Sequence, residues 1–357
     1  MTRGTRRFIF LIFLLIFIVL VPVIILYAQG YGFDFEKRTI VASGGIYLKS
    51  YPPRAEIYVN NTLRGTTNRM VRRLIPKTYD VKIIKEEFHP WQKNILVKPG
   101  LVTREEDIFL VPFNPKIQLV TSGSNEYSYF FEKPYSLNEV TKIIQKKSKY
   151  TIFKIDNLNL NIKKDKLYFL SNNNLYSLEL NKENIENSIL SPILVPNVLN
   201  YVMYKNGILY WDYFTEKIYE LDLTSLKSAE FFDQVFPGFN QGKWIISNDN
   251  KKILCQKDKS LEILWLEDVL DKTIEKRKGE VEKIDLGEQI SDLIWLPLTD
   301  EHLIVSTNDS ILITELDNRP PRNTINFITT EKPQIKYDAS DKILYFLSQE
   351  RLYQTEL

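Results

Sequence analysis

The first strong pattern in the chain is an uninterrupted apolar run. Residues 8–27 hold no charged side chain and consist almost entirely of Phe, Ile, Leu and Val. At about 1.5 Å per helical residue, such a run crosses the roughly 30 Å hydrocarbon core of a bilayer, which predicts a transmembrane helix over residues 8–28. A cleaved signal peptide is the alternative, but its apolar core is usually about 7–15 residues long. The cleavage sequence here, Leu26-Tyr27-Ala28, has a bulky Leu where a small residue is preferred.

The charges that flank the run predict its orientation. Arg3, Arg6 and Arg7 precede it, whereas residues 29–35 hold one acid and no base. By the positive-inside rule, residues 1–7 form a cytoplasmic stub and the chain beyond about residue 30 lies outside. We therefore expect a single-pass signal-anchor protein of the cell membrane. Its partner through residues 8–28 is the lipid bilayer, and a linker at 29–44 leads to a large extracytoplasmic part.

Beyond the linker, apolar and polar residues alternate with period two over residues 45–111. Each run is three to five residues long, and Pro, Gly or Asn lie between the runs, which is typical of short antiparallel strands. This pattern predicts a small β-sandwich. The runs are Ile46-Tyr-Leu48, Ala55-Glu-Ile-Tyr-Val59, Tyr79-Asp-Val-Lys-Ile83, Asn94-Ile-Leu-Val97 and Asp107-Ile-Phe-Leu110.

The turns between these runs carry a motif that resembles the PEGA domain. The resemblance covers about 65 residues and implies a small extracytoplasmic β domain of bacterial and archaeal envelope proteins, with a binding or spacing role and no established chemistry. The matching segments are Ser50-Tyr-Pro52-Pro53-Arg54-Ala55, Gly65-Thr-Thr67-Asn68, Leu74-Ile-Pro76-Lys77, Tyr79-Asp-Val81 and Glu87-Phe88-His89-Pro90-Trp91.

Four residues stand where the PEGA pattern prefers Gly: Arg54, Asn61, Lys77 and Glu87. Asn adopts a left-handed backbone at low cost, whereas a longer side chain does so with strain. We therefore expect altered turns at Arg54 and Lys77.

Residues 116–357 contain five loosely repeated hairpins. Their starts lie 41, 44, 51 and 40 residues apart, which is the period of a four-stranded propeller blade. The hairpins begin at Asp165, Asn206, Asn250, Glu301 and Asp341. The third contains Trp244-Ile-Ile-Ser247-Asn-Asp249-Asn250, which resembles the Trp-Ser-Pro-Asp-Gly signature of TolB-type propeller repeats. We expect a mainly β protein ending in a β-propeller of five or six blades. We prefer six, with first strands at 117–131; two open stacked sheets are the alternative.

Two insertions interrupt the repeats. Ser136 and Glu139 have the spacing of a capping box and predict a short helix through Lys147. The segment Glu267 to Glu288 is charged at nearly every second residue, so we expect a surface loop or an exposed helix.

Composition narrows the chemistry. The chain has 357 residues with 47 Lys and Arg against 45 Asp and Glu, so it is neither a polybasic nucleic-acid binder nor an acidic tail. Its one cysteine, Cys255, lies in an apolar context that favours a buried thiol in the core. A single cysteine cannot form a disulfide within the chain or a Cys-cluster zinc site. His89 and His302 fall in different modules. No phosphate-loop, Gly-x-Ser-x-Gly or His-Glu-x-x-His motif occurs. We expect neither catalysis nor a cofactor or metal.

The candidate binding residues are Arg64, Arg69, Arg72, Arg73 and Trp91. Four arginines within ten residues of a membrane-proximal module can contact anionic headgroups or acidic wall polymer, at about 1 kcal/mol per base. The alternative is a solvated strand edge, where bases discourage edge pairing. Trp91 fits a packed strand entry as well as a binding position.

Three functions are consistent with this organisation. The leading hypothesis is a noncatalytic membrane-anchored envelope protein whose PEGA-like and propeller domains bind an envelope protein or cell-wall polysaccharide. One alternative is an envelope glycan hydrolase with the PEGA-like module as its targeting domain, and another is a scaffold for the assembly of membrane proteins. The scarcity of His and Cys favours binding over catalysis.

Overall fold

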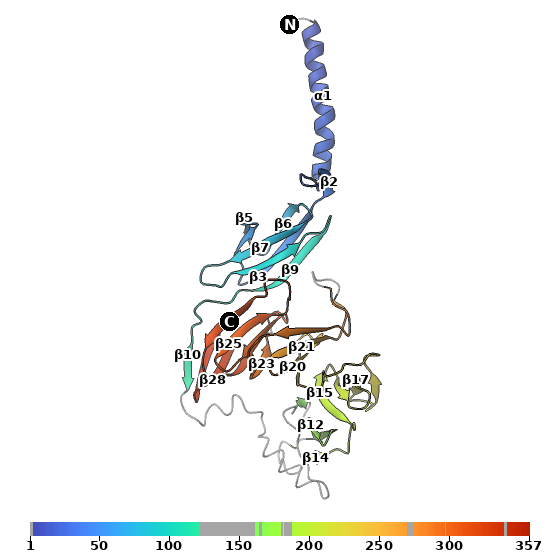
Figure 1. Ribbon diagram of the computed structural model, residues 1–357, viewed down its shortest axis with the longest axis vertical. Helices are drawn as coiled ribbons and strands as arrows, with labels where there is room; N and C mark the ends of the chain where they lie inside the picture. The colour runs from blue at the N-terminus through green and yellow to red at the C-terminus, as the bar shows by residue number, and fades with distance from the viewer. Residues whose placement is uncertain are drawn as a thin grey trace. The chain divides into compact units, whose positions relative to one another are not determined.

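The computed structural model places the described residues in two units (Figure 1). The first contains residues 3–113 and 317–323, and the second contains the rest of the described chain. The described residues are 3–121, 161–163, 166–179, 181, 188–269, 275–296, 298–338 and 341–357. The predicted helix from Ser136 to Lys147 lies outside them.

The first unit begins with helix α1, Arg3–Ala28. At about 1.5 Å per residue its 26 residues span roughly 39 Å, enough to cross a bilayer. None of its side chains is buried against protein, and Pro22 lies inside it near the C-terminal end. Among the described residues, α1 is the one helix long and apolar enough to cross a membrane.

A separate two-stranded hairpin follows the helix, formed by β1 (Tyr31–Asp34) and β2 (Thr39–Ala42). The Asp34 carboxylate accepts hydrogen bonds from the backbone N–H groups of Glu36 and Lys37, at 3.0 and 3.2 Å. These bonds define the turn, because a short carboxylate side chain satisfies backbone donors that the strands leave free.

Two sheets form the sandwich predicted from the alternating residues. One has the order β6-β3-β9, in which β3 and β9 are parallel, and the other has the order β5-β4-β7-β8. Ile46, Ile57, Val81 and Ile95 are fully buried between them. The strands are β3 (Gly44–Tyr51), β4 (Glu56–Val59), β5 (Thr62–Thr66), β6 (Arg69–Leu74), β7 (Thr78–Ile84), β8 (Trp91–Leu96) and β9 (Val102–Phe109).

The expectation of an altered turn at Arg54 is wrong. Arg54, Asn61 and Glu87 all have positive φ, at 62°, 61° and 68°, so the glycine-type backbone is kept although the glycines are gone. A non-glycine residue in this region costs about 1–2 kcal/mol. The surrounding sandwich core therefore imposes the turn against the local preference of Arg54 and Glu87. Lys77 is not among the residues with positive φ.

A buried polar cluster holds the segment Asp317–Asn323 within the first unit. The Lys93 ammonium is fully buried and donates to the carbonyls of Asp317 and Arg319, at 3.1 and 2.6 Å. The Arg319 guanidinium binds both carboxylate oxygens of Glu105 at 2.9 Å. Burial acts to raise the pKa of Asp317, but its hydrogen bonds with Arg319 hold that pKa below the ordinary value. Every charge in the cluster is thus compensated, as burial requires.

The described residues of the second unit form five four-stranded antiparallel sheets, and each predicted repeat forms the central hairpin of one of them. The mainly β, propeller-like architecture is therefore confirmed. The hairpins are β12 (Lys166–Ser171) with β13 (Asn174–Glu179), β16 (Gly207–Asp212) with β17 (Ile218–Asp222), β20 (Lys252–Gln256) with β21 (Ser260–Trp265), β24 (His302–Ser306) with β25 (Ser310–Glu315), and β28 (Ile343–Ser348) with β29 (Arg351–Glu356).

The outer strands complete these sheets. They are β11 (Asn161–Lys163), β14 (Ile189–Leu190), β15 (Val198–Tyr204), β18 (Ser228–Glu230), β19 (Lys243–Ile246), β22 (Val281–Asp285), β23 (Asp292–Trp295), β26 (Thr324–Thr329) and β27 (Gln334–Asp338). The fifth sheet takes β10 (Gln118–Thr121), which precedes the first repeat but pairs with β29. Over the described residues the sheets do not close into a ring (Figure 1).

Neighbouring sheets bury their faces against each other. Separate hydrophobic clusters join the first sheet to the second, the second to the third and the third to the fourth, and β23 contacts β27 of the fifth. A four-stranded sheet cannot cover both of its own faces, so stacking supplies the missing partner. The sixth blade, expected with first strands at 117–131, is absent from the described residues; residues 122–131 lie outside them.

The expected loop or exposed helix over Glu267 to Glu288 is wrong in part. Val281–Asp285 forms β22, which pairs along the edge of β21, and Ile284 is fully buried. Lys283 and Asp285 lie on the exposed face of this edge strand, opposite Glu262 and Ser260 of β21, whereas Glu282 shares the other face with Ile284 and lies 3.0 Å from the Lys276 ammonium.

Exchanging the positive-φ residues for glycine is expected to stabilise the sandwich. Relief of the backbone strain outweighs the entropy that glycine adds to the unfolded chain, so Arg54→Gly and Glu87→Gly should each gain up to about 1 kcal/mol. Hydrogen exchange of the β7 backbone amides in the full chain measures the free energy of opening of the sandwich and checks this prediction. Lys77→Gly is the matched control and should destabilise; a stabilisation there would contradict the assignment.

Cys255 is expected to be unreactive in the folded protein. It is fully buried on β20, its Sγ lies 3.1 Å from the Phe239 carbonyl, and burial raises the pKa of its thiol to about 12. Because the thiolate is the reactive form, a maleimide at neutral pH should label the full chain only after denaturation. Stoichiometric labelling of the native protein would show that this blade is open.

Candidate functional site

The predicted arginines lie where the chain passes from one sheet of the sandwich to the other. β5 is the edge of the four-stranded sheet, and β6 is the edge of the three-stranded sheet. Thr67 and Asn68 connect them. The Thr67 hydroxyl accepts from the Ala55 N–H at 2.9 Å, and Asn68 donates its N–H to the Leu48 carbonyl at 2.9 Å. These bonds hold the two edges side by side.

A β-bulge exposes two adjacent arginines on β6. Val71 pairs with Ile46 and Leu74 pairs with Gly44, so Gly45 lies opposite both Arg72 and Arg73. Arg73 has a φ of 59°. The extra residue turns both Val71 and Leu74 into the core although they are three positions apart. Arg72 and Arg73 are consequently both exposed.

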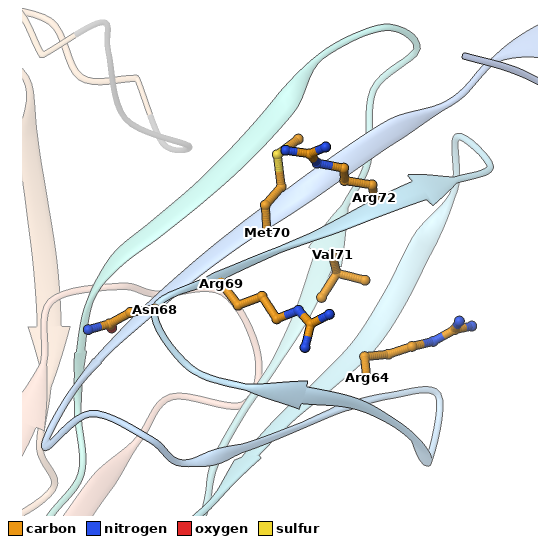
Figure 2. Close-up of a pocket in the computed structure, with 6 residues that line it drawn as sticks. All are labelled: Arg64, Asn68, Arg69, Met70, Val71 and Arg72. Atoms are coloured by element: carbon orange, nitrogen blue, oxygen red, sulfur yellow. The ribbon is translucent and has the colours of Figure 1, made fainter. Parts of the chain in front are cut away.

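Three of the predicted arginines line one cavity of about 570 Å³, formed by Arg64, Asn68, Arg69, Met70, Val71 and Arg72. Figure 2 shows the Arg69 side chain extending from β6 on the side where Arg64 projects from β5, whereas Arg72 lies beside Met70 across the β6 ribbon. We call Arg64, Arg69 and Arg72 the arginine cluster.

Gly65 allows Arg69 to take this position. A Cβ atom at residue 65 would lie 2.6 Å from the Arg69 Nη1 atom, closer than any real contact, and Gly65 has a φ of 123°. The guanidinium thus lies against the bare backbone of β5. The backbone geometry requires glycine here, whereas an added Cβ atom would only displace the flexible end of the Arg69 side chain.

The arginine cluster carries uncompensated positive charge. Within the described part of the chain, no carboxylate forms an ion pair with Arg64, Arg69 or Arg72, whereas Arg104 and Arg319 do have such partners. A guanidinium presents a planar fork of donors that matches phosphate or carboxylate oxygens. The cavity therefore has the chemistry of an anion-binding site.

The neighbouring phenol does not neutralise this charge. Burial raises the pKa of Tyr79 on β7, while the positive charges of Lys77 and Arg64 act in the opposite direction. The net shift is upward, so Tyr79 stays protonated and uncharged at neutral pH. Its hydroxyl donates to the Ile75 carbonyl at 2.9 Å.

The other two predicted residues lie elsewhere. The Arg73 guanidinium donates to the Tyr27 hydroxyl near the end of α1, with its Cζ 4.0 Å from the Tyr27 ring centroid. Trp91 is 4% exposed in the sandwich core, so it does not form part of the surface. Sequence reasoning missed Gly65 and Asn68 as site residues, for which the PEGA-type segment Gly65-Thr-Thr67-Asn68 was the available signal.

The cavity contains no catalytic machinery. Its lining offers guanidinium, amide, thioether and aliphatic groups, none of which acts as a general base or nucleophile at neutral pH. Among the described residues, no group of three or more His, Cys, Asp or Glu side chains could hold a metal ion. The arrangement can bind and orient an anion.

Residues 43–106 match the family described as the PEGA domain, which confirms the resemblance seen in the sequence. The match covers the whole arginine cluster. It includes β3 to β8 and most of β9, so the cluster is part of this domain. No curated protein matches the sequence.

Several solved structures resemble the chain at low identity. The extracellular domain of a hybrid two-component system from B. thetaiotaomicron aligns with a TM-score of 0.37 and 10% identity, over 55% of this chain and 27% of its own. The β-propeller domain of a Myceliophteria thermophila protein aligns with a TM-score of 0.36 and 11% identity, over 55% of this chain and 67% of its own. A Kluyvelomyces marxianus protein aligns with a TM-score of 0.34 and 10% identity, over 85% of this chain and 98% of its own. Because these scores are low, we base the propeller-like architecture on the five repeated sheets.

Proposed function

We propose that this chain is a noncatalytic, membrane-anchored binding protein of the cell envelope, in which the arginine cluster of the PEGA domain binds an anionic polymer outside the cytoplasm. The single observation that carries the proposal is the cavity lined by three arginines that form no ion pair with a carboxylate of the described residues. The remaining architecture supplies an anchor and a second, propeller-like unit.

A polymer fits this site better than a small anion. The three arginines project from two strands and from both sides of β6 (Figure 2), so a single phosphate cannot reach all of them. A chain of repeated phosphates or carboxylates can contact each guanidinium in turn, and the second and third contacts then form at a high effective concentration. Exposed contacts of this kind are weakened by salt.

Retention of the anchor is supported by the contact between Tyr27 and Arg73. Cleavage after Ala28 would remove Tyr27 and leave Arg73 without this ring. The helix also continues through Ala28 rather than ending before it, whereas a signal peptidase needs an extended segment at its cleavage site. With Arg3, Arg6 and Arg7 retained in the cytoplasm, both units lie outside.

The binding test uses the full chain in nanodiscs of phosphatidylcholine, with inorganic polyphosphate, polygalacturonate and dextran as probes. We expect both polyanions to bind and neutral dextran not to bind. At about 1 kcal/mol per base, changing Arg64, Arg69 and Arg72 together to Gln removes about 3 kcal/mol and should weaken polyanion binding by roughly a hundredfold, as measured by fluorescence titration.

The matched control changes Lys227, Lys259 and Arg351 to Gln, since these exposed bases of the second unit remove the same net charge. Binding by this variant should stay within about twofold of the original, because salt screens charges that do not touch the ligand. Equal losses in the two variants would show a net-charge effect and reject the site. Cleavage of a probe by the purified chain would reject the noncatalytic assignment.

Topology is tested separately with reporters at the C-terminus. We expect an alkaline phosphatase fusion to be active and a green fluorescent protein fusion to be dark, because these reporters require the outside and the cytoplasm, respectively. The fusion should sediment with membranes at its full length. A fluorescent fusion would overturn the extracytoplasmic assignment, and a soluble shortened product would show that the apolar segment is cleaved.

A further inference from the structure

The β1–β2 hairpin exposes an apolar face directly after the helix. Tyr31 and Phe33 alternate with Gly32 and Asp34, so the two aromatic rings lie on one face of β1. The register places Phe33 opposite Ile40 and Tyr31 opposite Ala42, so these four residues share that face. Tyr31, Phe33 and Ile40 are 41%, 46% and 56% exposed.

The opposite face of the hairpin packs against the sandwich at Gly32, where an added Cβ atom would lie 2.7 Å from the Ile75 side chain. Asp34 on this face is buried, whereas Thr39 at the turn is exposed. The apolar side chain on this face, Val41, lies opposite Gly32 and is half-buried. The large exposed apolar residues therefore lie on the other face, which is unfavourable in water.

The turn adds one more ring and two bases. Phe35 is 85% exposed and packs edge-to-face against Phe33, with ring centroids 5.0 Å apart. Lys37 and Arg38 follow it and are exposed. Within the described residues neither forms an ion pair. Aromatic rings beside basic side chains are the combination found at a membrane–water interface.

Chain connectivity places this face at the bilayer. Only Gln29 and Gly30 separate α1 from β1, and two residues reach at most about 7 Å. The interfacial layer on each side of the hydrocarbon core is about 5–8 Å thick, so β1 starts within it. The Tyr27–Arg73 contact holds the sandwich edge at the same level.

We propose that the apolar face of the β1–β2 hairpin lies in the outer lipid interface, with Phe33 and Phe35 among the headgroups and Lys37 and Arg38 at lipid phosphates. This inference rests on the anchored topology of the proposed function, but it concerns a different surface and ligand from the arginine cluster. The hairpin then fixes the height and rotation of the PEGA domain above the bilayer.

The test compares spin labels on adjacent residues of β2. Full-length Ile40→Cys places a nitroxide on the proposed lipid face, and Thr39→Cys places one on the opposite face while all aromatic residues remain. The native Cys255 is buried with a thiol pKa of about 12, so only the introduced thiol reacts. The chains are reconstituted in vesicles of phosphatidylcholine and phosphatidylglycerol, and collision rates with oxygen and an aqueous nickel complex are measured.

We expect the Ile40→Cys label to collide with the nickel complex several times less often than the Thr39→Cys label, and more often with oxygen. A label at Leu15→Cys in α1 reports whether the anchor is inserted. Equal nickel accessibility at the two β2 positions, with the Leu15→Cys label in lipid, would overturn the hairpin proposal and leave the anchored function standing. A Leu15→Cys label in water would overturn both.

A second variant separates lipid contact from local packing. Phe33→Ser with Phe35→Ser, combined with Ile40→Cys, should raise nickel accessibility at residue 40 in vesicles. The Lys37→Gln, Arg38→Gln pair should leave the nickel accessibility of the residue-40 label unchanged in detergent-free nanodiscs of phosphatidylcholine alone. It should change that accessibility in nanodiscs that contain phosphatidylglycerol. An unchanged label in the Ser variant would contradict insertion. Protection of Cys255 shows that the second unit of each variant is folded, and slow hydrogen exchange of the β7 amides shows that the sandwich is folded.

Discussion

Every apolar face in this chain needs a partner that excludes water, and that requirement organises the molecule. The two sheets of the sandwich cover each other around Ile57 and Ile95. The repeated hairpins cannot do so alone, so neighbouring sheets share clusters such as the one around Trp244 and Ile253. Two consecutive apolar surfaces stay exposed among the described residues: most of α1, apart from the contact of Tyr27 with Arg73, and one face of the β1–β2 hairpin. Under the proposals made above, lipid covers both.

Buried charges in this protein are paired with groups of opposite charge or with carbonyls, whereas the exposed arginines of the candidate site have no such partners among the described residues. Buried Lys252 lies 3.0 Å from a Glu301 carboxylate oxygen and 4.9 Å from the Trp265 ring centroid. Buried Lys93 is likewise surrounded by carbonyls. Inside the protein an unpaired charge is too costly to persist. The arginine cluster escapes this cost because it faces solvent, and its charge therefore remains available to a ligand.

Periodic patterns made most of the fold predictable. Period-two alternation located the strands of the sandwich, and the repeat of about 40 residues located five hairpins that became the centres of five sheets. The sequence predicts edge strands less well: the charged residues of β22 suggest a loop, although only two of them, Lys283 and Asp285, are exposed and Ile284 is buried. An edge strand has one neighbour, so its sequence carries only half of the usual signal.

The apolar span, the PEGA-type order of turns and the closeness of four arginines along the chain can be read from the residues alone, because these depend on local composition and spacing. Which arginines share a cavity depends on the folded sheets. The bulge opposite Gly45 and the bare backbone at Gly65 bring Arg64, Arg69 and Arg72 together and direct Arg73 to Tyr27. Likewise, the core of the sandwich holds Arg54 and Glu87 in left-handed turns that their side chains disfavour. Bulges and strained turns arise from pairing between strands distant in sequence, and burial across the whole sandwich outweighs the preference of any one residue.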